Sequence, residues 1–167
     1  MISEIVTVAQ KKDEKFLRKK TVPFDFKKFT RKEVNDLIVR MRRAMHAANG
    51  IGLSANQIGL EFAVFVAEIP DADGGTKFYA VFNPKIEKVS KETISFEEGC
   101  LSVPGIWGEV TRAEQIVVSG SNKMGKPVKV KAWGLLSRIF QHEIDHLNGK
   151  LFIDRAKKVY QSEKTSE

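Results

Sequence analysis

The feature that most constrains the fold is the segment 134–148, which reads GLLSRIFQHEIDHLN. Apolar residues recur there at helical spacing along two stripes. One stripe holds Leu135, Ile139, His142 and His146, and the other holds Leu136, Phe140, Ile144 and Leu147. A helix that is apolar around most of its circumference must be enclosed on most sides. We therefore expect this segment to be the central buried helix of an α+β fold.

The remaining elements follow from local patterns. Thr30 and Glu33 form a capping box that opens a helix over 30–48, and Asn49-Gly50 ends it. The glycine-rich segment 50–59 predicts a loop, and Pro84 is expected to close a strand. Further predictions are an irregular arm over 13–29, strands at 62–69, 77–84, 114–120 and 128–134, a half-buried strand or hairpin over 85–98, and a charged tail over 156–167 that starts as a helix.

Bulk properties indicate one domain over residues 1–167. A chain of 167 residues suits a single core, and one cysteine cannot form an internal disulfide. The first residues lack the apolar stretch of a signal peptide, and no run reaches the ~18 apolar residues that span a membrane. We expect a cytoplasmic monomer with no membrane contact.

The net charge is +7, spread along the chain. A solvated basic surface is the first interpretation, because no aromatic-interleaved basic motif of the RNA-binding kind is present. Weak association with a ribosome is the alternative that this charge allows.

The sequence QHEIDH at 141–146 has the spacing H-E-x-x-H. Residues four apart share one helix face, so His142 and His146 can present ring nitrogens to a single cation. Glu143 is turned by about 100° around the helix, where it can act as a general base without binding the cation. Such matches also occur by chance, but two buried imidazoles without partners would be costly.

The third ligand is not fixed by this motif. A metzincin needs a histidine at position 152, and this chain has Phe152. Asp154 follows the helix closely, and His46 lies at the end of the earlier helix. Cys100, in EEGCLSVPG, remains a candidate, although a lone cysteine is more often a small buried apolar residue.

Three stretches read together change the interpretation. GIGLSANQIG, EEGCLSVPG and QHEIDHLNGKLF resemble, in this order, the three signature motifs of the peptide deformylase family, and the resemblance covers roughly residues 13–155. It implies an α+β fold in which antiparallel or mixed sheets wrap around the helix that carries H-E-x-x-H. It also implies hydrolysis of the formyl amide of N-formylmethionine on nascent peptides, with release of formate.

The resemblance also implies roles for individual residues. Cys100, His142 and His146 correspond to the metal ligands, and Glu143 to the acid/base. Gln57 and the Leu101 backbone N–H correspond to the groups that stabilise the oxyanion. Substrate contacts are expected from Ile51, Gly52, Glu98, Gly99, Leu135 and Ile139, although core packing explains Leu135 and Ile139 equally well. Whether Glu98 supports substrate or pairs with a base such as Arg112 stays open.

The family generally uses Fe²⁺, and Zn²⁺, Ni²⁺ or Co²⁺ can occupy the site. Three features depart from the family pattern. Ser54 replaces a usual alanine and is expected to have little effect. Trp107 stands where many members carry a basic or smaller residue. The chain continues only about a dozen residues beyond Arg155, where many bacterial members have a basic helix that docks on the ribosome. A general metallopeptidase and a non-catalytic metal-binding module remain the alternatives.

Overall fold

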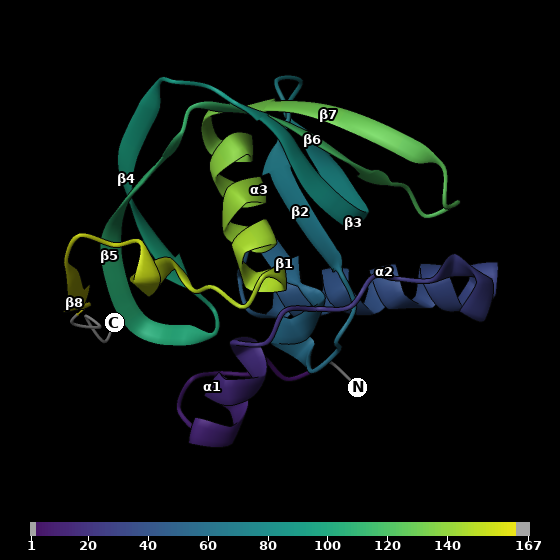
Figure 1. Ribbon diagram of the computed structural model, residues 1–167, viewed down its shortest axis with the longest axis horizontal. Coiled ribbons are helices and arrows are strands. Elements are labelled where there is room, and N and C mark those ends of the chain that lie inside the picture. The colour runs from purple at the N-terminus through teal and green to yellow at the C-terminus, as the bar shows by residue number, and fades with distance from the viewer. Residues whose placement is uncertain (1–2, 163–167) are drawn as a thin grey trace.

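Two antiparallel sheets surround a central helix in the computed structural model, which describes residues 3–162 (Figure 1). The five-stranded sheet has the order β1-β2-β3-β6-β7, and the three-stranded sheet has the order β4-β5-β8. The strands are β1 Gly52–Ser54, β2 Val64–Pro70, β3 Thr76–Val89, β4 Thr93–Cys100, β5 Val103–Ala113, β6 Gln115–Ser121, β7 Pro127–Trp133 and β8 Val159–Gln161. The helices are α1 Lys11–Leu17, α2 Arg31–Ala47 and α3 Gly134–Leu147, with short 3₁₀ turns at Phe26–Lys28, Ala55–Ile58 and Phe152–Asp154.

The central helix is α3, as its two apolar stripes predicted. Leu136, Ile139 and Phe140 pack into one core cluster with side chains of the five-stranded sheet, including Phe65 and Val118. Figure 1 shows α3 enclosed between the two sheets. The α+β fold with antiparallel sheets around this helix is therefore confirmed.

One long bent ribbon connects the sheets. β3 pairs with β6 in the five-stranded sheet, and β4 pairs with β5 in the three-stranded sheet. At the bend, the N–H of Ser90 donates to the carbonyl of Gln115 and the N–H of Glu114 donates to that of Glu92, both at 2.9 Å. The pairing thus continues from one sheet into the other, and the tip of the ribbon lies between Cys100 and Val103.

Two predictions about this ribbon were wrong. Pro84 does not close a strand, because β3 runs on to Val89. A register shift between Phe82 and Lys85 takes up the proline, and Asn83 there has φ 50°. The stretch 85–98 is no separate hairpin, since its two halves belong to different sheets.

Helix α2 is confirmed with its predicted cap. The Thr30 hydroxyl accepts from the N–H of Glu33, and the Glu33 carboxylate accepts from the N–H of Thr30. At the other end, the N–H of Gly50 donates to the Met45 carbonyl and Asn49 has φ 54°. This capped end of the helix turns the chain, which then continues directly into β1.

Three other predictions need correction. The arm over 13–29 is not wholly irregular, because α1 occupies Lys11–Leu17. The loop over 50–59 contains β1 and a 3₁₀ turn. The start of the tail is the strand β8, which pairs with β5, rather than a helix, and residues 163–167 of the tail lie outside the described residues. Among the described residues, no helix has both the length and the apolar character that crossing a membrane requires.

Candidate metal and catalytic centre

Cys100, His142 and His146 converge from two elements. Cys100 ends β4 at the tip of the ribbon, and the histidines lie one turn apart on α3. Their ligand atoms all lie within 4.8 Å of one another. Cys100 Sγ is 3.1 Å from His146 Nε2, which is 3.2 Å from His142 Nε2. The sequence motif and the isolated cysteine are therefore brought together.

His142 is oriented by a carboxylate behind it. Glu98 Oε2 lies 2.9 Å from His142 Nδ1, so the opposite ring nitrogen, Nε2, faces the cluster. Glu98 itself is buried and accepts from the guanidinium groups of Arg112 and Arg138. Burial opposes its ionisation, but Arg112 and His142 hold the pKa of Glu98 well below its usual range.

This pairing answers the question left open about Glu98. Its carboxylate is committed to His142 and two arginines, and the N–H groups of Arg112 also reach Asp145, which Arg155 binds. Glu98 lines the cavity, and its side chain supports a histidine. The position of a metal-facing imidazole commonly depends on such a carboxylate.

The Cys100 thiol and the His142 imidazole favour the ionised forms, a thiolate and an imidazolium. Burial works against the Cys100 thiolate, but the two adjacent imidazoles offset it and bring the pKa of the thiol well below 9. Burial likewise disfavours the His142 imidazolium, but Cys100 and Glu98 outweigh it and raise the pKa of His142 to about 10. A thiolate is the form that binds soft or borderline cations.

Glu143 lies beside the cluster and packs against Gly52 of β1. It is 3% exposed, and burial raises the pKa of its carboxyl even though both histidines and Ser54 act in the opposite direction. A Cβ on Gly52 would lie 2.5 Å from Glu143 Oε1 and 2.9 Å from Ile139. Only glycine at position 52 lets β1 pass this close to the carboxylate.

Ser54 has a contact that the sequence did not reveal. Its hydroxyl lies 2.7 Å from Glu143 Oε2 and 2.9 Å from the Glu143 carbonyl oxygen. Ser54 was expected to have little effect, and the structure adds that its hydroxyl contacts the Glu143 carboxylate directly. The only available signal was that a buried hydroxyl needs a partner.

Gln57 reaches the cluster from the 3₁₀ turn after β1. Its Oε1 accepts from the N–H of Ser54 at 2.9 Å, which fixes the amide orientation. The Gln57 Nε2 then points to Ser102 Oγ at 3.1 Å and to Cys100 Sγ at 3.7 Å. An uncharged N–H donor thus stands next to the thiolate.

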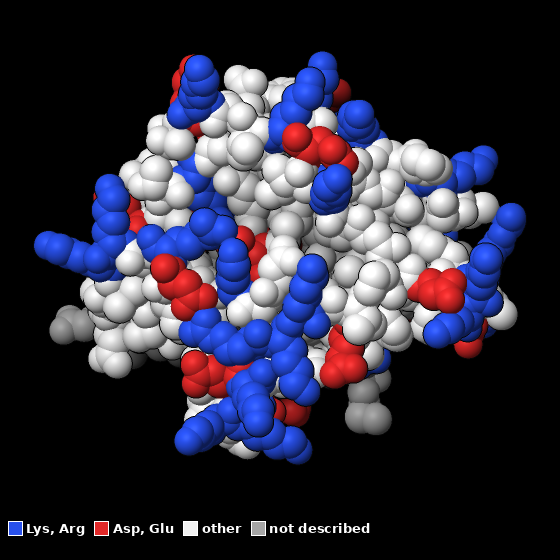
Figure 2. Space-filling model, in the orientation of Figure 1, with Lys and Arg blue, Asp and Glu red and all other residues white. Residues whose placement is uncertain are grey.

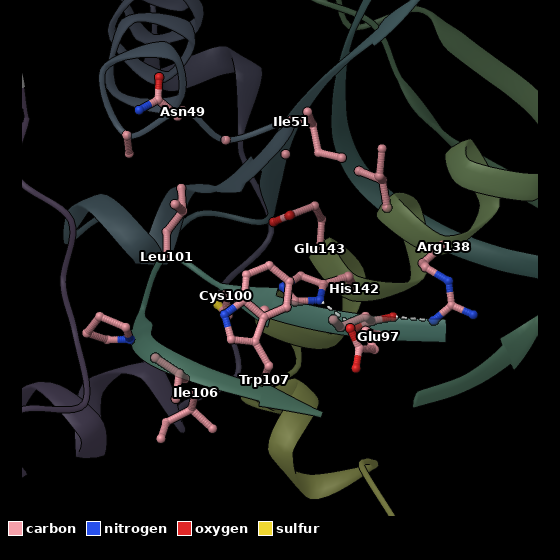
Figure 3. A pocket seen from close by; sticks show the side chains of 18 of the residues that line it. Asn49, Ile51, Glu97, Cys100, Leu101, Ile106, Trp107, Arg138, His142 and Glu143 are labelled. Carbon is pink, nitrogen blue, oxygen red and sulfur yellow. Dashed lines mark hydrogen bonds and ion pairs between the residues drawn. The ribbon is translucent and has the colours of Figure 1, made fainter. Parts of the chain in front are cut away.

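A cavity of about 620 Å³ opens onto this cluster, and Figure 3 shows Cys100, His142 and Glu143 together at its floor. Every site residue predicted from the sequence lines it except His146, which is 1% exposed and lies behind it. The predicted lining residues are Ile51, Gly52, Gln57, Glu98, Gly99, Cys100, Leu101, Leu135, Ile139, His142 and Glu143. Most of the wall is apolar.

The donor set fits one cation of intermediate softness. One thiolate and two imidazole nitrogens face a common point, and the cavity leaves that point accessible from one side. The other candidate ligands lie elsewhere: His46 pairs with Glu68 at 2.5 Å, and Asp154 pairs with Arg18 at 2.5 Å. The cluster therefore has three protein donors and room for a fourth, exchangeable ligand.

Known proteins share this arrangement of motifs and fold. The family model described as polypeptide deformylase matches residues 2–162. A peptide deformylase of Elusimicrobium minutum is 45% identical over 149 residues, covering 86% of this chain and 83% of that protein. One from a strain of Prochlorococcus marinus is 44% identical over 125 residues, covering 75% of this chain but only 62% of its own length.

The fold comparison agrees with the sequence comparison. The crystal structure of a probable peptide deformylase from Synechococcus phage S-SSM7 has a TM-score of 0.82 and 41% identity. The superposition covers 91% of this chain and 98% of that one. With the three motifs gathered around one cavity inside this fold, the chain belongs to the polypeptide deformylase family.

Proposed function

We propose that the protein is a metal-dependent hydrolase that removes the formyl group from the N-terminal formylmethionine of newly made proteins and releases formate. The observation that carries this proposal is the cluster of Cys100, His142 and His146 at the floor of an apolar cavity. Glu143 and Gln57 stand beside that cluster, where a general base and an oxyanion donor are needed.

Cys100, His142 and His146 would hold one divalent cation. A cation bound there supplies Lewis-acid chemistry and lowers the pKa of a water ligand toward neutrality. We propose Fe²⁺ as the native ion, with Zn²⁺, Ni²⁺ or Co²⁺ able to replace it, since a mixed thiolate and imidazole set accepts all of them. Glu98, through His142 Nδ1, keeps Nε2 aimed at the cation.

Glu143 is proposed to move the protons. Its carboxylate accepts a proton from the attacking water and later donates it to the leaving amine. Burial raises its pKa, which suits a group that must both take and return a proton near neutral pH. The Ser54 hydroxyl holds one carboxylate oxygen, so the other remains directed past Gly52.

Gln57 and the backbone N–H of Leu101 are proposed to stabilise the oxyanion that forms at the formyl carbon. The Gln57 amide is fixed by Ser54 and donates without titrating. Removing one such donor commonly costs on the order of 10² to 10³ in rate.

The substrate would lie as an extended strand in the cavity. β1 and β4 are each the outermost strand of their sheet, and Gly52 and Gly99 place backbone at the cavity wall. We propose that the methionine side chain enters the apolar part formed by Ile51, Leu135 and Ile139. Glu98 also lines this cavity.

A formate-release assay tests the proposal. The protein is purified without oxygen, its metal content is measured, and formyl-Met-Ala-Ser is offered as substrate. We expect one divalent ion per chain and formate release that a chelator abolishes. Cleavage of internal peptide bonds without formate release would favour a general metallopeptidase. Metal binding with no hydrolysis of either kind would favour a non-catalytic metal-binding module.

A weak association with the ribosome is proposed for the cytoplasmic, monomeric enzyme. Figure 2 shows Lys and Arg side chains gathered over α1 and the segment around it. Lys12, Lys15 and Lys19 are exposed there. We expect salt-sensitive cosedimentation with ribosomes that is weakened by Lys12→Glu with Lys15→Glu, but not by Lys129→Glu with Lys131→Glu in β7. Absence of binding at low salt would contradict the association, and a second sedimenting species would contradict the monomer.

A further inference from the structure

Trp107 lines the cavity, and its side chain is partly exposed to solvent. It lies in β5 directly opposite Gly99 of β4 and is 41% exposed. A Cβ built on Gly99 would meet three atoms of the indole ring at 3.2 Å. The ring therefore lies over the backbone of Gly99, and the missing side chain at that position is what allows it.

Trp107 belongs to an apolar rim. Ile51, Phe96 and Leu135 also line the cavity, and each is a large apolar residue that is about half exposed or more, at 48%, 65% and 51%. Together with Trp107 they come from four different segments of the chain. Exposed apolar side chains that gather at one cavity mouth indicate a surface for binding apolar groups.

The alternation of side chains along a strand relates Trp107 to a specific substrate position. Residues directly opposite each other in a sheet share a face, so Trp107 and Gly99 face one side, while the neighbouring Glu98 faces the other side and reaches His142 of α3. A peptide paired along the free edge of β4 alternates in the same way. When its methionine points toward α3, the residue after methionine points to the side that carries Trp107.

The strand β8 pairs with β5 at Trp107, on the side away from β4. Tyr160 of β8 lies opposite Trp107 on the other side of β5, and its hydroxyl donates to Glu97. Trp107 is therefore paired on both sides within the sheet, with Gly99 on one neighbouring strand and Tyr160 on the other. Figure 3 shows it standing in front of Cys100 and His142, on the approach to the floor of the cavity.

We infer that Trp107 is a specificity-determining residue that favours substrates with an apolar or aromatic residue immediately after formylmethionine. This inference rests on the proposed deformylase function and concerns the same site. An acidic residue at that position is disfavoured, because it would face an apolar ring with the Glu97 carboxylate nearby.

The test compares kcat/KM for formyl-Met-X-Ser peptides, where X is Ala, Leu, Phe or Glu, on the metal-loaded enzyme. We expect Phe and Leu to exceed Ala by at least roughly fivefold, mainly through KM, as aromatic contacts allow. Trp107→Ala should bring the Phe/Ala ratio close to one, and Trp107→Phe should keep most of it. Trp133→Ala is the matched control, because Trp133 is an exposed tryptophan in β7 outside the cavity lining.

A binding measurement gives a second readout. Trp133→Phe leaves Trp107 as the sole tryptophan of the chain, and its emission should change when the product Met-Phe-Ser is added. Equal kcat/KM for all four peptides, or a Phe/Ala ratio that Trp107→Ala leaves intact, would overturn the inference while the proposed function stands. No formate release from any peptide would overturn the proposed function and the inference with it.

Discussion

Glu143 shows how single residues in this site act through their neighbours. Burial raises the pKa of its carboxyl, and the imidazoles together with Ser54 limit that rise. Gly52 leaves space for Oε1 on one side, while Ser54 holds Oε2 on the other. The carboxylate is therefore placed by residues on β1, and its pKa is set by burial, by the two histidines of its own helix and by Ser54.

Replacing Glu143 by Gln is expected to remove catalysis and leave the metal. The amide oxygen can still accept from Ser54, but the side chain can no longer take a proton. We expect kcat/KM for formyl-Met-Ala-Ser to fall by roughly 10² to 10⁴. Metal content should remain one ion per chain, measured on the same sample. Glu109→Gln, at an exposed position of β5, is the control, and wild-type turnover by Glu143→Gln would refute the role of this residue.

At the scale of elements, the C-terminal end of α3 is capped and packs against the segment that follows α1. Gly149 has φ 73°, and the N–H of Lys150 donates to the Asp145 carbonyl at 2.9 Å. A Cβ on Gly149 would clash with the carbonyl oxygen of Arg18. The end of α3 therefore fixes where the N-terminal segment crosses the molecule.

Gly149→Ala and Gly74→Ala separate two reasons for a glycine, its positive φ and the close approach of a neighbouring chain segment. Gly74 has φ 81° with no atom within 4 Å of its added Cβ, so alanine there adds only left-handed strain of about 1–2 kcal/mol. Gly149→Ala adds the clash with Arg18 and should lower the free energy of unfolding clearly more. Urea unfolding of both variants measures this, and equal losses would mean that the chain near Arg18 shifts freely.

Glu68 links α2 to β2 in a pH-dependent way. Hydrogen bonds from Arg42, and smaller ones from Thr76 and His46, outweigh burial and lower the pKa of Glu68 from 4.5 to about 2. A carboxyl with a lowered folded pKa stabilises the fold above pH 4.5, and that contribution is lost as pH falls toward 2. Because its partners are partly exposed, solvent reduces the effect.

The corresponding variant is Glu68→Gln. Its unfolding midpoint in urea should lie below that of the wild type at about pH 6, and the gap should narrow as pH falls from about 4.5 to about 3. Glu61→Gln, at an exposed position outside the ion pairs of the described residues, should show no such narrowing. A gap that stays constant with pH would contradict the role given to Glu68.

At the scale of the whole molecule, a bound cation would join parts that are distant in sequence. Cys100 belongs to the three-stranded sheet, whereas His142 and His146 belong to the helix that packs on the five-stranded one. Since the ligand set exists only in the folded chain, binding adds directly to stability.

Removing the metal should therefore lower Tm. For an ion present at about 100 times its Kd, the stabilisation is about 2.7 kcal/mol, or roughly 5–10 °C for a chain of this size. Thermal unfolding with and without a chelator measures the difference. Cys100→Ser should unfold at the same temperature in both conditions, and a wild type unaffected by the chelator would show that the ion adds nothing to the fold.

Local patterns predicted the two long helices α2 and α3, but they missed α1 and predicted a helix where β8 lies. Long-range contacts explain why several strands were missed. Thr30 and Glu33 defined the start of α2 because a capping box is a contact within one turn. The continuation of β3 past Pro84 depends on pairing with β6, which local sequence does not encode. β8 is a strand only because β5 offers it an edge.

The same distinction applies within the site. The family motifs located the residues that meet in the cavity, because the chemistry requires particular side chains there. The contacts of Ser54 with Glu143 and of Arg138 with Glu98 join residues 89 and 40 positions apart. Only the folded chain reveals which buried polar groups satisfy one another.

The bent ribbon also makes the ligand set depend on the register of β4 and β5. Cys100 stands at the tip, beyond the register shift next to Gly99. A slip of one residue anywhere along β4 and β5 would turn Cys100 to the opposite face, away from α3. A mispaired molecule could then present two histidines but no thiolate. Metal binding would thus distinguish correctly paired chains from mispaired ones, because only the correct strand register presents all three ligands.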